Sequence, residues 1–311
     1  MVDMLTDWTD AHTQMFQKET FTFGHNLEAT GLFTDEALIE LLENHPSEEL
    51  DVCSMVSIDP RYPNKHSTGD FRGVSAETLL EAVKAGRIWV NVRRAMNLNP
   101  KYREVLDSMY GELGERAGHK AFSARGGILI SSPSSQTPYH FDKTETILWH
   151  VRGRKRIYVY PLTQEFISDE DYENTITHAL IDDLPYKPAY DDQAIILDLE
   201  PGQAVTWPLN SPHRVDNSEF CVSVTTEYST RECIFKNAGM IANATLRQKF
   251  GMTPMWSEET LPSRYMKFAL GQVLKKTGMA VNTTGPDLVT FKVDPEIEGF
   301  VVDTEPFERN F

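Results

Sequence analysis

The sequence is short of cysteine, of basic residues and of long apolar runs. Its three cysteines, Cys53, Cys221 and Cys233, are odd in number and lack the CxxC spacing of zinc sites, so they indicate reduced thiols rather than a disulfide framework. No apolar stretch approaches the roughly 20 residues that a membrane helix needs, and the acidic start of the chain does not resemble a signal peptide. We therefore expect a cytoplasmic protein that does not enter a membrane.

Basic residues are outnumbered by acidic ones. The chain has 30 lysines and arginines against 46 aspartates and glutamates, a formal net charge of −16, and its basic residues are scattered apart from a short cluster at 152–156. Binding to a nucleic-acid backbone needs a broad basic surface, so this balance argues against a nucleic-acid partner. An acidic surface is compatible with a basic peptide partner, but simple solubility is the favoured explanation.

Helix and strand signals divide the chain into three parts. Residues 1–125 carry helix signals with one strand-like run at 87–92, residues 126–235 carry short strands separated by turn residues, and residues 236–311 return to helices before an acidic tail. Short strands in close succession, without helix-length connections, predict an antiparallel barrel or sandwich. We therefore expect a mainly β protein, with a core at 126–235 that N-terminal strands join and that helices flank at both ends.

Caps mark the predicted helices. Thr34, Ser75 and Asn99 each precede an amphipathic run in the first part of the chain. The last predicted helix, 262–277, carries an apolar stripe made of Met266, Leu270, Val273 and Leu274. Such a stripe usually faces the core, and a contact between two copies of the chain is the alternative.

Lys155 stands among apolar residues of a predicted strand, 154–160. Strand alternation places it on the same face as Ile157 and Val159, opposite Arg156. An ammonium group on an apolar face costs several kcal/mol unless an anion meets it. A buried carboxylate or an acidic ligand would supply that anion, whereas a side chain that reaches past the rim of a barrel into water is the other interpretation.

His140 and Asp142 stand two positions apart, so strand alternation directs both side chains to one side. The best candidate for a third metal ligand is His213, which follows a Pro-bounded turn after the strand-like run 203–207. Two imidazoles and one carboxylate leave three metal positions open, as in non-haem Fe(II) oxygenases. A structural zinc site would need a fourth ligand, and none is evident nearby.

The order of these residues resembles the JmjC-type, cupin-fold 2-oxoglutarate oxygenases, most closely the asparaginyl hydroxylase known as factor inhibiting hypoxia-inducible factor and its bacterial cupin-like relatives. In that group an HxD motif is followed, after a strand and a glycine-containing turn, by a lysine that binds the far carboxylate of 2-oxoglutarate. His140, Asp142, Gly153 and Lys155 stand in that order without a gap. Thr137, three residues before the first histidine, matches a threonine that also holds the cosubstrate.

The distal segment is similar to the second cupin motif. Gly202, Pro208, His213 and Asn217 match it, whereas Asn210 stands where the motif has a glycine. The resemblance covers roughly residues 126–230, and it implies a double-stranded β-helix (jelly-roll) core.

The resemblance implies an Fe(II)- and 2-oxoglutarate-dependent dioxygenase in which His140, Asp142 and His213 bind the iron, and Lys155 and Thr137 hold the cosubstrate. The implied reaction consumes 2-oxoglutarate and dioxygen, and it hydroxylates or demethylates a protein, peptide or small-molecule substrate. A homodimer through the C-terminal helices would match the asparaginyl hydroxylase.

The strand-like run 220–228 adds two further candidates. Ser223 and Thr225 lie on its less apolar face, together with Cys221 and Glu227. Both hydroxyls could line the cosubstrate pocket, and a plain polar strand face is the alternative.

Two other hypotheses stay open at this point. A cupin that binds another divalent metal without 2-oxoglutarate, such as an isomerase or a cofactor-independent dioxygenase, would have no stated need for Lys155. A non-catalytic binding or regulatory module could keep the barrel, although the complete ligand set argues for an enzyme. Fold alone does not decide the substrate.

Overall fold

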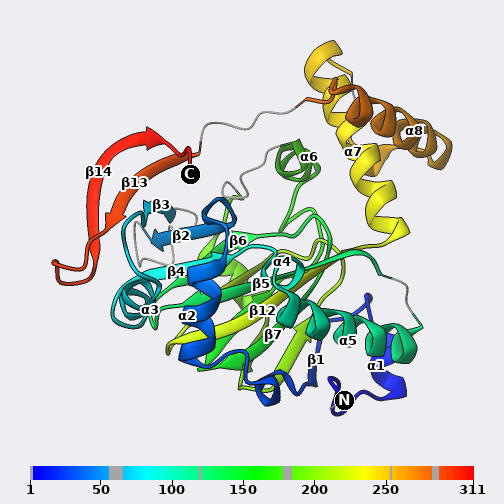
Figure 1. Cartoon of the computed structure of the whole chain (residues 1–311). Helices are drawn as coiled ribbons and strands as arrows, with labels where there is room; N and C mark the ends of the chain where they lie inside the picture. The colour runs from blue at the N-terminus through cyan, green and yellow to red at the C-terminus, as the bar shows by residue number, and fades with distance from the viewer. Residues whose placement is uncertain (1–2, 56–65, 119–120, 178–183, 253, 282–286) are drawn as a thin grey trace.

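Two β-sheets face each other, and helices lie outside them (Figure 1). The computed structural model describes residues 3–55, 66–118, 121–177, 184–252, 254–281 and 287–311. The strands are β1 (Phe21–Gly24), β2 (Leu50–Met55), β3 (His66–Asp70), β4 (Ile88–Val92), β5 (Phe122–Ser131), β6 (Gln136–His140), β7 (Glu145–Arg152), β8 (Lys155–Val159), β9 (Ile195–Leu199), β10 (Gln203–Thr206), β11 (His213–Asn217), β12 (Cys221–Ser229), β13 (Leu288–Val293) and β14 (Val301–Glu308).

The larger sheet has ten strands in the order β1-β10-β7-β12-β5-β4-β2-β3-β13-β14, and the smaller has four in the order β6-β11-β8-β9. Neighbouring strands are antiparallel, except that β13 runs parallel to β3. Between β5 and β12 the chain passes back and forth between the two sheets. The architecture is therefore mixed α/β, built on large and mostly antiparallel sheets.

The helices are α1 (Asp10–Met15), α2 (Asp35–Asn44), α3 (Ala76–Ala85), α4 (Ala95–Leu98), α5 (Pro100–Ala117), α6 (Asp169–Thr177), α7 (Arg231–Phe250) and α8 (Leu261–Thr277). The three helices for which caps were predicted, α2, α3 and α5, begin at those caps. The side chains of Thr34, Ser75 and Asn99 each accept a hydrogen bond from the first turn of α2, α3 and α5. These caps satisfy backbone N–H groups that the helix itself leaves unpaired. Among the described helices, none is both long and apolar enough to cross a lipid bilayer.

Strand alternation builds the layers. On β7, Ile147, Trp149 and Val151 belong to the main core, which also contains the buried faces of α2, α3 and α5. Leu148 belongs instead to a cluster between the two sheets, together with Ile157 of β8. Each such buried side chain contributes about 1.5–3 kcal/mol relative to exposure. One face of the larger sheet thus packs against the helices. The other face lines the interior between the two sheets, toward which Lys155 points.

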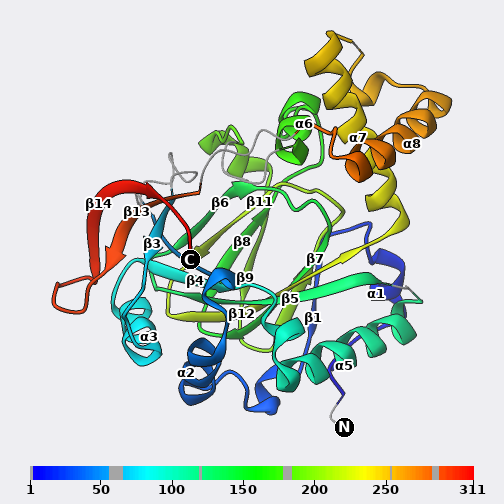
Figure 2. The same cartoon turned by 45° about the horizontal axis from the view of Figure 1, so that its top comes forward.

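The two C-terminal helices lie together at the opposite end from α2, α3 and α5 (Figure 2). The predicted core stripe of α8 is wrong in part: Met266 and Val273 are 68% and 56% exposed, whereas Gly271 and Leu274 are buried. A side chain at Gly271 would collide with the carbonyl oxygen of Ala238 on α7. The close approach of α7 to this glycine therefore decides which face of α8 is covered.

Three predicted irregular segments are strands. The serine- and proline-rich segment before His140 contains β6, the turn expected to deliver His213 leads directly into β11, and the expected acidic tail contains β14. β6 and β11 are stabilised by pairing with each other across a long stretch of chain, so local composition did not indicate them. β14 pairs with the preceding strand, β13.

Candidate active site

The three predicted metal ligands come together at the ends of two paired strands. His140 ends β6, His213 begins β11, and the two residues are partners in the antiparallel register. Asp142 follows in the loop between β6 and β7, with its carboxylate oxygens 3.8 Å from His140 Nε2 and 3.5 Å from His213 Nε2. The three donor atoms lie within 4.8 Å of one another, which one metal ion can span. Among the described residues, no other His, Cys, Asp or Glu joins this group.

Both histidines are held in the tautomer that a metal needs. His140 Nδ1 donates to the carbonyl oxygen of Pro138 at 2.7 Å, and His213 Nδ1 donates to that of Ser211 at 3.0 Å. The Nε2 atoms, which face Asp142, are therefore unprotonated in the neutral rings. Burial, followed by the charge of His140, lowers the pKa of His213 to about 4. Neutral imidazole is the form that binds metal, so the donor set fits a divalent ion such as Fe(II).

Asn210 keeps the turn before His213 in the shape that a glycine would give it. Its φ is 66°, in the left-handed region that glycine favours and that asparagine tolerates better than most residues. Asn210 Nδ2 also donates to the carbonyl oxygen of Asp142 at 2.7 Å. Asn210, which stands where the motif has a glycine, therefore keeps the backbone conformation of the turn. It also adds a contact to the loop that carries Asp142.

Lys155 points into the interior, as alternation predicted. It is 4% exposed, while Arg156 beside it is exposed and pairs with Asp198. Within the part of the chain that the structure describes, no hydrogen bond or ion pair to the ammonium of Lys155 is found. Burial lowers the pKa of Lys155 to about 8. The interpretation as a lysine that reaches the solvent is therefore wrong, and the buried ammonium has no protein anion beside it.

The pairing of β11 with β8 and β6 shows how far along the strands each residue lies from the predicted metal ligands. His213 pairs with Val159 of β8, Val215 with Ile157, and Asn217 with Lys155. At about 3.3 Å per residue, Lys155 starts roughly 13 Å below the level of His213. Thr137 of β6 pairs with Val215, so it lies between those two levels.

Ser223 and Thr225 occupy different surroundings on β12. Ser223 is fully buried, and its hydroxyl lies 3.1 Å from His150 Nδ1. Burial, followed by the charge of Lys155, lowers the pKa of His150 to about 3, so this histidine is a neutral neighbour of the lysine. Thr225 lies two residues nearer the metal ligands and lines the cavity described next.

A cavity of about 680 Å³ reaches one of the three predicted metal ligands, His140. Beside His140, its inner wall includes Thr137, Thr225 and Glu227. Burial, followed by the charge of Asp142, raises the pKa of Glu227, and Thr144 Oγ1 donates to its carboxylate at 3.3 Å. Lys155 and Ser223 lie deeper along their strands and do not line this cavity.

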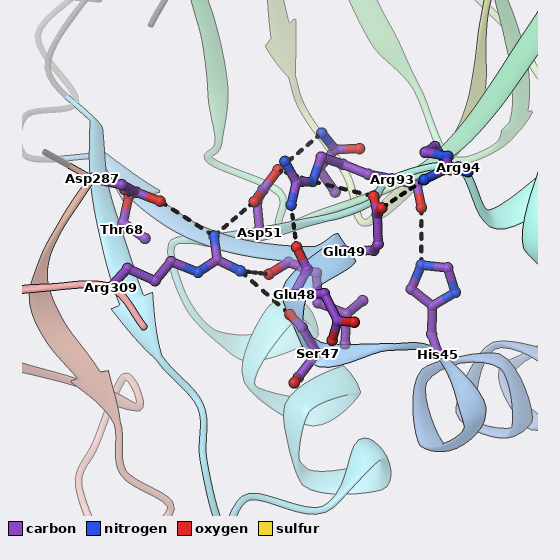
Figure 3. Close-up of polar contacts among 12 residues, drawn as sticks. His45, Ser47, Glu48, Glu49, Asp51, Thr68, Arg93, Arg94, Asp287 and Arg309 are labelled. Atoms are coloured by element: carbon purple, nitrogen blue, oxygen red, sulfur yellow. Dashed lines mark hydrogen bonds and ion pairs between the residues drawn. The ribbon is translucent and has the colours of Figure 1, made fainter. Parts of the chain in front are cut away.

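Sequence reasoning missed the outer wall of the cavity (Figure 3). Arg309, which follows β14, donates to Asp51 Oδ1 at 2.8 Å and to the carbonyl oxygen of Leu50 at 2.6 Å, and it lies 3.6 Å from Asp287 Oδ2. On the other side, Arg93 Nε lies 3.3 Å from Asp51 Oδ2. Arg309 and Asp51 are 258 positions apart, so no local pattern could have indicated their contact.

Acidic and basic side chains alternate along the walls of the cavity. Glu49 pairs with Arg94 at 2.9 Å, and Glu227 lies 3.7 Å from Arg125. Together with the pairs of Arg309 and Arg93, each wall carboxylate thus has an arginine beside it. The net charge of −16 is therefore not concentrated at the mouth of the cavity.

Comparison with solved structures identifies the fold. An X-ray structure of Escherichia coli YcfD superimposes with a TM-score of 0.50 and 17% identity, covering 86% of this chain and 67% of that chain. A crystal structure of the Escherichia coli ribosomal oxygenase YcfD superimposes with a TM-score of 0.50 and 14% identity, covering 93% of this chain and 75% of that one. The chain is similar in fold to YcfD.

A further structure of YcfD, in complex with cobalt and 2-oxoglutarate, gives a TM-score of 0.47 at 16% identity, covering 87% of this chain and 67% of that chain. No protein-family model matches the sequence. No curated protein matches it significantly. The likeness to YcfD therefore concerns the fold, and the chemistry has to be argued from the residues of this chain.

Proposed function

We propose that the chain is an Fe(II)- and 2-oxoglutarate-dependent oxygenase, a dioxygenase that hydroxylates its substrate. The observation that carries the proposal is the combination of a His-Asp-His group and a buried lysine, Lys155, beside which no anion is found among the described residues. A metal-binding cupin without 2-oxoglutarate would leave this ammonium desolvated for no purpose, at a cost of several kcal/mol.

The strand order supports a double-stranded β-helix core of the JmjC or cupin type. The strands β5-β12-β7-β10 of the larger sheet face β6-β11-β8-β9 of the smaller sheet. Successive strands alternate between the two sheets, apart from β8 and β9, which are neighbours in one sheet.

His140, Asp142 and His213 would hold the iron. Each of them supplies one donor atom, and the two Nδ1 hydrogen bonds fix the planes of the imidazole rings. The ring of Trp207 lies 4.4 Å from that of His213 and covers it on the apolar side. Three coordination positions stay open for the cosubstrate and dioxygen.

Lys155 would bind the far carboxylate of 2-oxoglutarate, with Thr137, Thr225 and Ser223 along the path between it and the metal. The register supports this order, because Thr137 lies between the levels of His213 and Lys155. A charge-assisted hydrogen bond in this interior is stronger than one in water. Apolar neighbours such as Ile157 and Val159 exclude water from the cosubstrate.

With metal and cosubstrate bound, 2-oxoglutarate is oxidised to succinate and CO2, and the second oxygen atom of O2 is inserted into a substrate C–H bond. The protein supplies placement and electrostatics. Its cavity of about 680 Å³ brings a substrate group next to His140.

A protein side chain is the favoured substrate, and a small molecule is the alternative. The motif of this chain resembles that of an asparaginyl hydroxylase, and Escherichia coli YcfD, of similar fold, is a ribosomal oxygenase. The mouth of the cavity is lined by paired charges, which suits a polar peptide segment.

The test is anaerobic titration of the Fe(II)-loaded protein with 2-oxoglutarate, followed by visible absorption. A charge-transfer band that saturates in wild type and needs far more ligand in Lys155→Ala is the expected result. If iron is bound but no band appears, the chain is instead a metal-binding cupin that does not use 2-oxoglutarate.

We also propose that α7 and α8 form a homodimer contact. Large apolar side chains are exposed along these helices and their connection: Phe250 (71%), Met252, Leu261, Tyr265, Met266 and Val273. An apolar surface of this kind on adjacent elements is typical of an interface. Light scattering of wild type and of Tyr265→Glu tests this, with a dimer and a monomer expected; a monomeric wild type would contradict it.

A further inference from the structure

The loop between β6 and β7, which carries Asp142, is held by side chains from other segments of the chain. Asn210, in the turn before β11, donates from Nδ2 to the carbonyl oxygen of Asp142 at 2.7 Å. Oδ1 of the same amide accepts a hydrogen bond from Lys236 Nζ, on α7, at 3.1 Å. Asn210 is 1% exposed, so both ends of its amide are engaged away from water.

Helix α7 makes a second contact with the same loop. Asn237 Nδ2 donates to the carbonyl oxygen of Lys143 at 2.6 Å, and Cys233 Sγ lies 3.3 Å from that oxygen. Cys233, Lys236 and Asn237 lie on one face of the first turns of α7, at spacings of three and four residues. Two consecutive carbonyl groups of the loop are therefore bound from α7, one directly and one through Asn210.

The direct contacts of the Lys236 ammonium are with the neutral groups of Asn210 and Tyr172, and the carboxylates of Glu232 and Asp169 act on it from farther away. Lys236 Nζ lies 4.3 Å from the ring centroid of Tyr172, and within the described residues it forms no ion pair. A cation bound to one end of an amide polarises it and strengthens the hydrogen bond that the other end donates. The charge of Lys236 therefore acts on the bond between Asn210 and Asp142.

We infer that Asn210 and Lys236 are positioning residues for the metal centre, which hold the Asp142 loop so that the Asp142 carboxylate faces His140 and His213. The peptide unit is planar, so displacement of this carbonyl group moves the Cα atom to which the carboxylate is attached. The inference rests on the proposed function and adds that the metal centre depends on the docking of α7. Outer contacts of this kind typically contribute about 10- to 100-fold to metal affinity.

Titration of the full chain with Co(II) tests the inference without any turnover, because the visible d–d bands report both affinity and ligand geometry. Asn210→Gly keeps the left-handed turn and removes both hydrogen bonds, and Lys236→Met keeps the side-chain length and removes the charge. Asn243→Ala is the matched control, since Asn243 lies two turns further along α7 and contacts Glu173 and Lys267 rather than the loop.

We expect Asn210→Gly and Lys236→Met to weaken Co(II) binding by about 10- to 100-fold and to change the band shape, while Asn243→Ala binds as wild type does, even if it unfolds at a lower temperature. Wild-type affinity and bands in both variants would overturn the inference, as would equal weakening in Asn243→Ala. Lys236→Gln, which keeps a donor, should restore part of the affinity if Lys236→Met proves too unstable, and no restoration would count against the inference. A wild-type chain that does not bind Co(II) would instead remove the proposed metal centre itself.

Discussion

His140 and His213 face each other across two paired strands, with ring centroids 4.2 Å apart and ring planes tilted by 55°. Each ring is fixed by a hydrogen bond from Nδ1 to a main-chain carbonyl two residues earlier in the chain. Their unprotonated Nε2 atoms and the Asp142 carboxylate are therefore close together before any metal is bound. These three electron-rich groups repel one another, and a cation bound between them removes that repulsion.

Metal should therefore stabilise the fold. At 100 times its dissociation constant, a metal that binds only the folded state raises the free energy of unfolding by about 2.7 kcal/mol. We expect Fe(II) or Co(II) to raise the melting temperature of wild type and of Asp198→Ala, which removes an exposed carboxylate. Asp142→Ala should show no such rise and no iron-dependent turnover of 2-oxoglutarate; a normal response there would exclude Asp142 as a ligand.

Replacement of Lys155 should separate cosubstrate binding from metal binding. Loss of a buried charged partner costs about 2–4 kcal/mol, so Lys155→Ala should bind 2-oxoglutarate on the order of 100-fold more weakly. Its affinity for Co(II) should stay at the wild-type level. Calorimetry measures both, and Arg156→Ala, which alters the exposed neighbour, is the control. Equal affinities in Lys155→Ala and Arg156→Ala would rule out this role.

The affinity for 2-oxoglutarate should fall in alkaline solution. The pKa of Lys155 in the free protein is about 8, below its ordinary value, and only the protonated form attracts the carboxylate. A bound anion raises this pKa, so the association constant should be constant below the free-state pKa. It should then fall by up to about tenfold per pH unit above it. Lys155→Arg, which stays protonated, should bind with little change over the same range; the same alkaline loss in that variant would assign the titration to another group.

Removal of Arg309 should loosen the outer wall of the cavity. Its side chain is 8% exposed and binds Asp51 and three main-chain carbonyls, so Arg309→Ala should cost about 1–3 kcal/mol. Hydrogen exchange should speed up in β13 and β14 before it does so in β7. Arg103→Ala, which breaks an exposed pair on α5, should cost less than about 0.5 kcal/mol. Unchanged exchange in β13 and β14 would show that Arg309 does not anchor them.

Gly153 shapes the turn that leads into Lys155. Its φ is 82°, and a side chain there would collide with the carbonyl oxygen of Phe220. Gly153→Ala should therefore destabilise the protein by more than about 1 kcal/mol in chemical denaturation. Gly111→Ala, in an exposed part of α5 with open space around it, should stabilise by about 0.5–1 kcal/mol. A neutral Gly153→Ala would mean that the turn can relax.

Local rules were enough for the parts of the site that lie on regular strands. Alternation of side chains was sufficient to place Lys155 on the apolar face of its strand, although it left burial and a side chain that reaches the solvent as alternatives, which the structure decides in favour of burial. The helix starts at Thr34 and Ser75 followed from capping chemistry. The same rules failed for β6, which directly follows a serine-rich segment and contains Pro138, because its pairing with β11 overrides local preference. They could not reveal Arg309 or the contact between Lys236 and Asn210, since both depend on where distant segments meet.

The parallel pairing of β13 with β3 also bears on the order in which the molecule assembles. Thr68 and Asp287, joined at this edge, are 219 positions apart, so the edge can form only after a very long loop has closed. The strands that carry His140 and His213 pair with each other, and Asp142 lies in the loop directly after the first of them, so this group does not depend on that closure. During folding, and in transient openings of the native state, the three proposed metal ligands can therefore be in place while the outer wall of the cavity is still missing.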